Sequence, residues 1–251
     1  MSVSGRLFSV SADCMRRFAD MIPFRRHAAI FMYHSVSFSP AFWAVCPAEF
    51  EWQMRYLRDR GYRVIPLAEL VACAMRGDNA PRRSIVLTFD DGYEDNYSSV
   101  FPVLRRYGYP ATVFLTTGLI GRKDVHVRGG ALMPMLDASQ IREMSDSGLV
   151  DFGAHTRTHP RLPRISLPAA EGEMRESRDA VLRLTGVVPA HFAYPYGDHS
   201  PAVVSAAAGL FAAAVTVRPG SVPRRPDPFL LPRQAVDSSV SRFRFRLKLP
   251  I

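Results

Sequence analysis

Short apolar runs recur along the chain from about residue 28 onward, and they alternate with stretches in which apolar residues lie three or four positions apart. Runs of the first kind predict buried strands, and the wider spacing predicts helices. The expected helices end before Gly61, Gly108, Gly148, Gly186 and Gly209, where glycine can terminate a helix. The expected strands are 29–33, 63–65, 85–89, 111–115, 149–154, 191–194 and 213–217.

Strands that alternate with helices predict parallel pairing with right-handed crossovers. About seven such units suit either a closed α/β barrel or a long open sheet. In both architectures the functional groups gather at the carboxyl ends of the strands. Polar residues that directly follow a predicted strand are therefore the candidates for a site.

The two ends of the chain have patterns of their own. Residues 1–27 predict an extension with an amphipathic helix and a cationic side, either docked on the domain or in peripheral contact with a membrane surface. Residues 28–251 are expected to form the main domain. The tail 241–249 alternates apolar and basic residues, which favours a half-buried strand, with a terminal helix as the alternative.

Composition narrows the function only slightly. The chain has 251 residues, of which 47% are hydrophobic and 22% charged, so a disordered chain is excluded. The formal net charge of +9 favours acidic partners, but no nucleic-acid-binding motif accompanies it, and nucleic-acid binding is not expected. The three cysteines have no metal-ligand spacing. No signal peptide or membrane span is found in the sequence, so a cytoplasmic location is expected.

Three polar clusters directly follow predicted strands. Asp90 and Asp91 follow the strand 85–89, His155 and His159 follow 149–154, and a Pro-Tyr-Gly-Asp segment at 195–198 follows 191–194. Each cluster alone is a weak signal, because Asp-Asp-Gly is also a good turn sequence. Their shared position at strand ends is what points to one site.

These residue types suit a metal-dependent hydrolase. Two imidazoles and one carboxylate are a common catalytic zinc set, and a second carboxylate beside them could act as general base. Side chains of adjacent residues on a strand point to opposite faces, so Asp90 and Asp91 can share a site only if the chain turns there. Gly92 permits such a turn.

The three clusters resemble the motifs of the NodB-homology polysaccharide deacetylases, carbohydrate esterase family four. Thr88-Phe-Asp-Asp-Gly92 is similar to the first motif, His155-Thr-Arg-Thr-His159 to the second, and Ala193-Tyr-Pro-Tyr-Gly197 to the third. The resemblance covers about residues 30–249. It implies a distorted (β/α)₇ barrel and hydrolysis of N-acetyl groups on an oligo- or polysaccharide that contains N-acetylglucosamine.

The resemblance also implies roles for single residues. Asp91, His155 and His159 would bind a divalent metal, most often Zn²⁺, and Asp90 would be the general base for a metal-bound water that attacks the acetamide carbonyl. The backbone N–H of Tyr196 would stabilise the oxyanion. Substrate contacts are expected from Tyr93, Pro195, Tyr196, Asp198 and Arg233.

Two features depart from the family pattern. Many members have an arginine at the position of Ala193 that holds the catalytic base, and Arg233 could replace it from another strand end. Many members also have a late Leu-x-His that supplies the general acid, whereas this chain has no histidine after His199. His34 follows the predicted strand 29–33 and is the candidate acid, as in a family branch with that strand moved to the front of the chain. A capping or core-edge histidine is the alternative reading.

These two departures leave a second reading open, in which the chain is a catalytically impaired carbohydrate-binding relative. The intact Asp90-Asp91 and His155/His159 pairs favour the enzyme, because a binding protein has no need of a base beside a metal. A zinc protease is not expected, because the sequence has no His-Glu-x-x-His.

Overall fold

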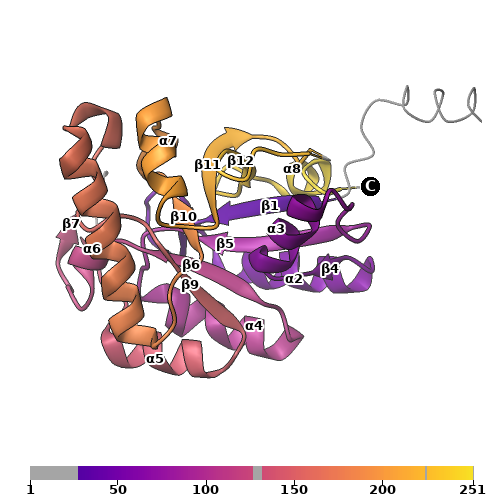
Figure 1. The fold of residues 1–251 in the computed structure, drawn as a ribbon. Coiled ribbons are helices and arrows are strands. Elements are labelled where there is room, and N and C mark those ends of the chain that lie inside the picture. Colours follow the sequence, from indigo (N-terminus) through magenta and orange to yellow (C-terminus); the bar gives the residue numbers. More distant parts are fainter. Residues whose placement is uncertain (1–27, 127–131, 224, 251) are drawn as a thin grey trace, which may run out of the picture.

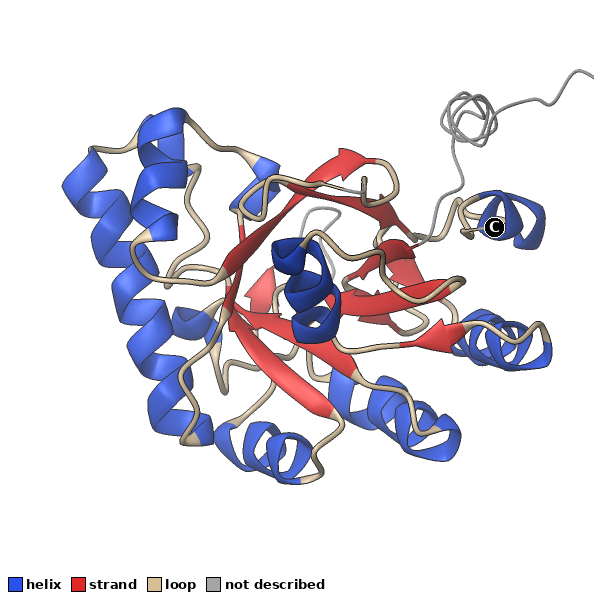
Figure 2. Cartoon of the chain, turned by 45° about the vertical axis from the view of Figure 1, so that its right-hand side comes forward, coloured by secondary structure: helices blue, strands red, loops and turns tan. Residues whose placement is uncertain are grey.

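A closed barrel of parallel strands forms the centre of the computed structural model, which describes residues 28–126, 132–223 and 225–250. In spatial order the strands are β1, β12, β11, β10, β9, β6 and β5, and pairing of β1 with β5 closes the ring. Figure 2 shows these strands surrounded by helices. The predicted distorted (β/α)₇ barrel is confirmed. Its strands are β1 Ala28–Tyr33, β5 Ser84–Phe89, β6 Ala111–Leu115, β9 Val150–Ala154, β10 His191–Ala193, β11 Ala213–Pro219 and β12 Leu231–Ala235.

The barrel strands form where the sequence has its apolar runs, because every residue of β1, β5 and β6 is buried. A further short strand, β4 (Arg63–Val64), pairs with the start of β5, while β6 pairs with the end of β5 on the same side. This divided edge distorts the barrel. Four two-residue strands form two small sheets outside it: β2 Ser35–Val36 pairs with β3 Ala44–Val45, and β7 Val125–His126 pairs with β8 Leu132–Met133.

Helices connect the parallel strands and cover the outside of the barrel (Figure 1). The five predicted from glycine stops are present. The helices are α2 Pro47–Asp59, α3 Leu67–Arg76, α4 Phe101–Tyr107, α5 Ala138–Asp146, α6 Leu167–Thr185, α7 Pro201–Ala208 and α8 Arg242–Leu247. A π-helical turn, η1 (Asn96–Val100), leads directly into α4, and the 3₁₀ turns are η2 Thr117–Leu119, η3 Leu162–Arg164 and η4 Pro195–Gly197.

The sequence pattern did not predict α3, which covers one end of the barrel. Leu67, Leu70 and Val71 of this helix pack against residues near the starts of strands, including Ile30 and Val86. The end from which the strands begin is thereby filled with apolar side chains. The carboxyl ends of the strands remain available for a site.

The tail is a helix, so the predicted strand at 241–249 is wrong and the alternative is right. Strict alternation would place Phe243, Phe245, Leu247 and Leu249 on one face. The structure buries Phe245 and Leu249, four residues apart, while Phe243 is 66% and Leu247 61% exposed. Helical spacing matches that burial.

The predicted helix within 1–27 lies outside the described residues. Within the described part, no helix is both long enough and apolar enough to cross a bilayer.

Candidate active site

The carboxyl ends of β1, β5, β6 and β9 surround a cavity of about 370 Å³. Two of the three motif clusters line it directly, and the third contributes one residue. Residues at its wall include all four of the predicted metal and base residues and His34. The lining residues are His34, Phe42, Trp43, Asp90, Asp91, Tyr93, Thr116, Leu119, Val125, Met135, His155, His159, Tyr196 and Val217.

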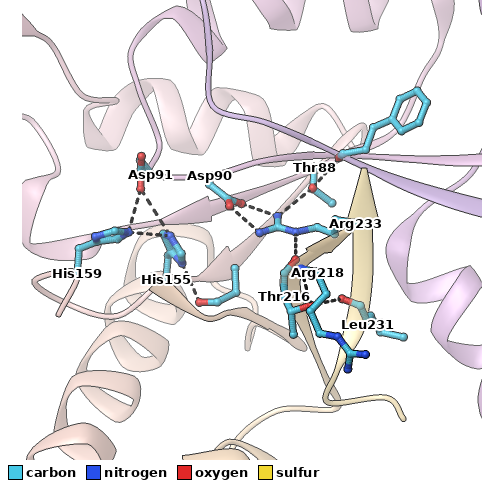
Figure 3. Close-up of polar contacts among 11 residues, drawn as sticks. Thr88, Asp90, Asp91, His155, His159, Thr216, Arg218, Leu231 and Arg233 are labelled. Atoms are coloured by element: carbon cyan, nitrogen blue, oxygen red, sulfur yellow. Dashed lines mark hydrogen bonds and ion pairs between the residues drawn. The ribbon is translucent and has the colours of Figure 1, made fainter. Parts of the chain in front are cut away.

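Three potential metal ligands converge at this cavity. One ligand atom each from Asp91, His155 and His159 lies within 4.8 Å of the other two. Both imidazole Nε2 atoms are 3.5 Å from Asp91 Oδ1, and they are 3.2 Å from each other (Figure 3). Residues about 65 positions apart in the chain therefore form the compact set that the motifs predicted.

The protein environment orients His155 and favours the neutral form of His159. His155 is buried, and its Nδ1 lies 2.7 Å from the Ala193 carbonyl oxygen, so that Nε2 faces Asp91. Such outer hydrogen bonds fix the tautomer of a metal-binding histidine. Burial, together with the nearby His155, lowers the pKa of His159 to about 4. A neutral imidazole is the form that binds a metal ion, so the donor set fits a divalent cation.

Backbone conformation allows Asp90 and Asp91 to face the same site. Asp91 has φ +71° and Gly92 φ +83°, and the Gly92 N–H donates to the Asp90 carbonyl at 2.9 Å. The strand thus turns at Asp91 itself as well as at the expected Gly92. Positive φ values at non-glycine residues are costly and concentrate at functional sites. In the described residues, four of the five such residues lie in the three motifs: Asp91, Thr156, His159 and Tyr196.

Asp90 lies beside this set in a buried ion pair with Arg233. The guanidinium donates two hydrogen bonds of 2.7 Å, one to each carboxylate oxygen (Figure 3). Burial acts to raise the pKa of Asp90, but the charge and hydrogen bonds of Arg233 overcome it and hold the pKa well below its usual range. Arg233 therefore makes the contact with Asp90 that the sequence analysis suggested in place of an arginine at position 193.

Arg233 cannot make the predicted substrate contact. Its side chain is 0% exposed, and it also donates to Thr88 Oγ1 at 3.1 Å and to the Thr216 carbonyl at 2.9 Å. A guanidinium fixed in this way behind Asp90 is outside the cavity wall. Its contact is with the predicted base, not with a ligand.

His34 lies at the cavity wall, at the end of β1, and its main chain is held from the neighbouring η1 turn. Asn96 Nδ2 donates to the His34 carbonyl at 2.9 Å, and Asp95 Oδ1 accepts from the Val36 N–H at 3.1 Å. The Ser35 hydroxyl also donates to Asp95. π-Helical turns of this kind are frequent at functional sites. The sequence analysis did not identify Asp95 and Asn96, because their contacts with residues 34–36, two of them with backbone groups, leave no local sequence pattern.

Only some of the predicted substrate-contact residues lie at the cavity wall. Tyr93 and Tyr196 line the cavity, and the Tyr196 ring is 4.6 Å from the His159 ring and 4.1 Å from the Arg161 guanidinium carbon. Asp198 forms an ion pair with Arg161 and, like the buried Pro195, is not at the cavity wall. The structure therefore offers two of these side chains to a ligand.

Apolar residues that sequence reasoning missed complete the cavity wall. They include Phe42, Leu119, Val125, Met135 and Val217, from loops and short strands far apart in the chain. No local sequence signal distinguishes them from core residues. Their presence gives the polar site an apolar rim.

Comparison with families of known proteins gives one match of wide extent. The family model described as polysaccharide deacetylase matches residues 77–213. The Bacillus subtilis (strain 168) protein YxkH is 29% identical over 213 residues, which cover 84% of this chain and 72% of that protein.

Other relatives carry more specific names. The poly-beta-1,6-N-acetyl-D-glucosamine N-deacetylase of Staphylococcus aureus (strain MRSA252) is 27% identical over 163 residues, 62% of this chain. The matched part is 54% of that enzyme, so this chain aligns with about half of its length.

Two solved structures have the same fold over most of this chain. Streptococcus pyogenes deacetylase PplD, in complex with acetate, has a TM-score of 0.78 and 26% identity, with coverage of 88% of this chain and 97% of that one. IcaB from Ammonifex degensii has a TM-score of 0.76 and 27% identity, with coverage of 88% and 94%.

Proposed function

The chain belongs to the polysaccharide deacetylase family, whose members hydrolyse a carbon–nitrogen bond, and we propose that it removes N-acetyl groups from an N-acetylglucosamine-containing oligo- or polysaccharide. The observation that carries this proposal is the arrangement in one cavity of a three-ligand metal set, an ion-paired carboxylate and His34. Together these groups can supply the electrophile, the base and the acid of a metal-assisted amide hydrolysis.

Asp91, His155 and His159 would hold the divalent cation, for which zinc is the first candidate. Two neutral imidazoles and one carboxylate leave coordination positions open, as catalytic zinc sites do. Such an ion polarises a carbonyl oxygen and lowers the pKa of water. The chain's own residues supply the remaining chemistry.

Asp90 is the proposed general base. Its lowered pKa keeps it ionised at neutral pH, and Arg233 fixes the carboxylate at the cavity wall, where it can accept a proton from the attacking water. The backbone N–H of Tyr196, in a turn with φ +60°, is the proposed donor to the developing oxyanion.

His34 is the proposed general acid. It lies at the same cavity wall as Asp90, with its main chain held by Asn96. From there it would protonate the amine as the carbon–nitrogen bond breaks, leaving acetate and a glucosamine unit. This arrangement is the one expected of the family branch in which the acid follows the first strand.

The name of the Staphylococcus aureus relative makes poly-β-1,6-N-acetylglucosamine the first substrate to test, with a β-1,4-linked chitin oligosaccharide as comparison. We expect acetate release from one of them, loss of release with a chelator, and recovery with Zn²⁺. Asp90→Asn is the control that keeps the cavity shape. If both glycans bind but neither releases acetate with any divalent metal, the chain is a carbohydrate-binding relative and not a deacetylase.

A further inference from the structure

A glutamate on α6 holds the segment between the two histidine ligands. Glu173 Oε2 accepts hydrogen bonds from the backbone N–H groups of Arg157 and Thr158, both at 2.8 Å. Glu173 Oε1 accepts from the Thr158 hydroxyl at 2.7 Å. One carboxylate therefore binds three donors that lie between His155 and His159.

The chain after β6 also holds this segment. The N–H groups of Thr117 and Gly118 donate to the carbonyls of Thr156, at 3.1 Å, and Arg157, at 2.7 Å. This approach requires glycine, because a Cβ at Gly118 would lie 2.6 Å from the Arg157 carbonyl oxygen. The segment is thus fixed by hydrogen bonds both to α6 and to the chain after β6.

Such clamping has a physical reason in the backbone of the segment. Thr156 has φ +65° and His159 φ +63°, both in the left-handed region that non-glycine residues rarely adopt. Strained residues persist only where the surroundings over-determine their conformation. Without the Glu173 contacts the segment would relax, and His159 would leave the position that puts its Nε2 3.5 Å from Asp91 Oδ1.

We propose that Glu173 is a positioning residue of the metal site, holding the 156–159 backbone so that His159 meets Asp91 and His155. This inference rests on the proposed metal-dependent function. Glu173 contacts the loop rather than the ligand atoms, so it acts through His159. Nothing in the three sequence motifs includes it, since it lies on the following helix.

The chain supplies a matched control one helical turn away. Glu176 lies three residues further along α6 and pairs with the guanidinium of the same Arg157 at 3.1 Å, where both side chains are 57% exposed. An exposed pair of this kind contributes little. Glu176→Ala therefore removes a carboxylate beside the same loop without removing a contact to its backbone.

The experiment titrates the purified full chain with Co²⁺ and follows the visible absorption of the bound ion. Changing outer-shell partners of metal ligands typically costs 10–100-fold in affinity. For Glu173→Ala we expect about this loss and an altered Co²⁺ spectrum. Glu173→Gln should stay near wild type, because one amide oxygen can accept both backbone N–H groups, and Glu176→Ala should match wild type.

Circular dichroism gives the folded fraction at which all variants are compared. If Glu173→Ala does not fold, Glu173→Asp shortens the reach by one methylene and should weaken Co²⁺ binding by about tenfold. If the folded Glu173→Ala variant, or Glu173→Asp in its place, had the same Co²⁺ affinity and spectrum as Glu176→Ala, the positioning role would be overturned. Absence of Co²⁺ binding by the wild type would instead overturn the proposed function.

Discussion

Arg233→Met is the substitution that tests most sharply how the site is built. It replaces a fully buried guanidinium with an apolar side chain of similar length and leaves Asp90, whose side chain is 3% exposed, without its partner. Two hydrogen bonds to the carboxylate disappear, along with those to Thr88 and Thr216. The remaining charge is then buried and uncompensated.

The expected loss in the free energy of unfolding at neutral pH is about 3–5 kcal/mol, the usual result of removing one partner of a buried ion pair. In the wild type, folding lowers the pKa of Asp90. The ion pair therefore stabilises the fold fully above the pKa of the unfolded carboxyl group, about 4, and this stabilisation is lost as the pH falls toward the pKa of Asp90 in the folded protein. In the variant, burial dominates and raises that pKa above the unfolded value. The difference between wild type and variant should therefore narrow as the pH falls toward about 4.

Urea unfolding followed by circular dichroism, with chelator present throughout, measures this difference. Arg122→Met is the matched control, because Arg122 pairs with Asp124 where the two side chains are 52% and 71% exposed. It should change stability by no more than about 1 kcal/mol at any pH. If Arg233→Met cost no more than this control, or if its cost did not depend on pH, the ion pair would not have the role assigned to it.

Three further substitutions have expected outcomes. His34→Ala should lower kcat by about 10²–10⁴-fold with an unchanged unfolding midpoint, since the hydrogen bond from Asn96 is to the His34 backbone carbonyl and stays in the variant. Near-normal turnover would refute the role of His34 as the acid. Gly92→Ala should lower the free energy of unfolding, measured by thermal unfolding, by about 1–3 kcal/mol, because the new Cβ would lie 2.6 Å from Leu115 Cδ2. Gly121→Ala is the control, because a Cβ there meets no atom within 4 Å. Equal losses of stability in the two variants would contradict the steric argument. Asp95→Ala should lower the free energy of unfolding in urea by about 1–3 kcal/mol, because the Val36 N–H and the Ser35 hydroxyl lose their acceptor. Unchanged stability would show that water replaces the carboxylate.

The barrel was predictable where strand burial is complete on both faces. β1 and β5 are buried along their whole length, and an apolar run fills most of each, so their sequence alone indicates strands of a parallel sheet. β12 was missed because it contains Pro232, Arg233 and Gln234, and the reason for its buried arginine is a carboxylate 143 residues earlier in the chain. The sequence does not display such a pairing.

The tail illustrates a different limit. Its alternation of phenylalanine and arginine satisfies a strand pattern over the whole segment, yet tertiary contacts decide for a helix. Phe245 packs against Phe31, and the guanidinium groups of Arg242 and Arg246 lie over the Trp52 ring. Contacts between distant segments thus override a short local period.

For the site, the motifs predicted which residues meet, but not how the backbone brings them together. The sequence predicted a turn at Gly92, but it did not predict the positive φ of Asp91 that helps to bring Asp90 and Asp91 to one cavity. Glu173 and Asn96 act mainly on backbone N–H and carbonyl groups, which nearly every residue type has, so the partner residues show no pattern in the sequence. Side-chain chemistry is visible in a sequence, whereas support for the main chain is not.

The most direct test of the central claim is metal analysis of the purified chain after equilibrium dialysis against Zn²⁺, beside the Asp91→Ala and His159→Ala variants. The wild type should bind about one ion per chain, and each variant should bind far less at the same free Zn²⁺ concentration. Full occupancy in both folded variants would contradict the account, because the ion would then be held by other groups.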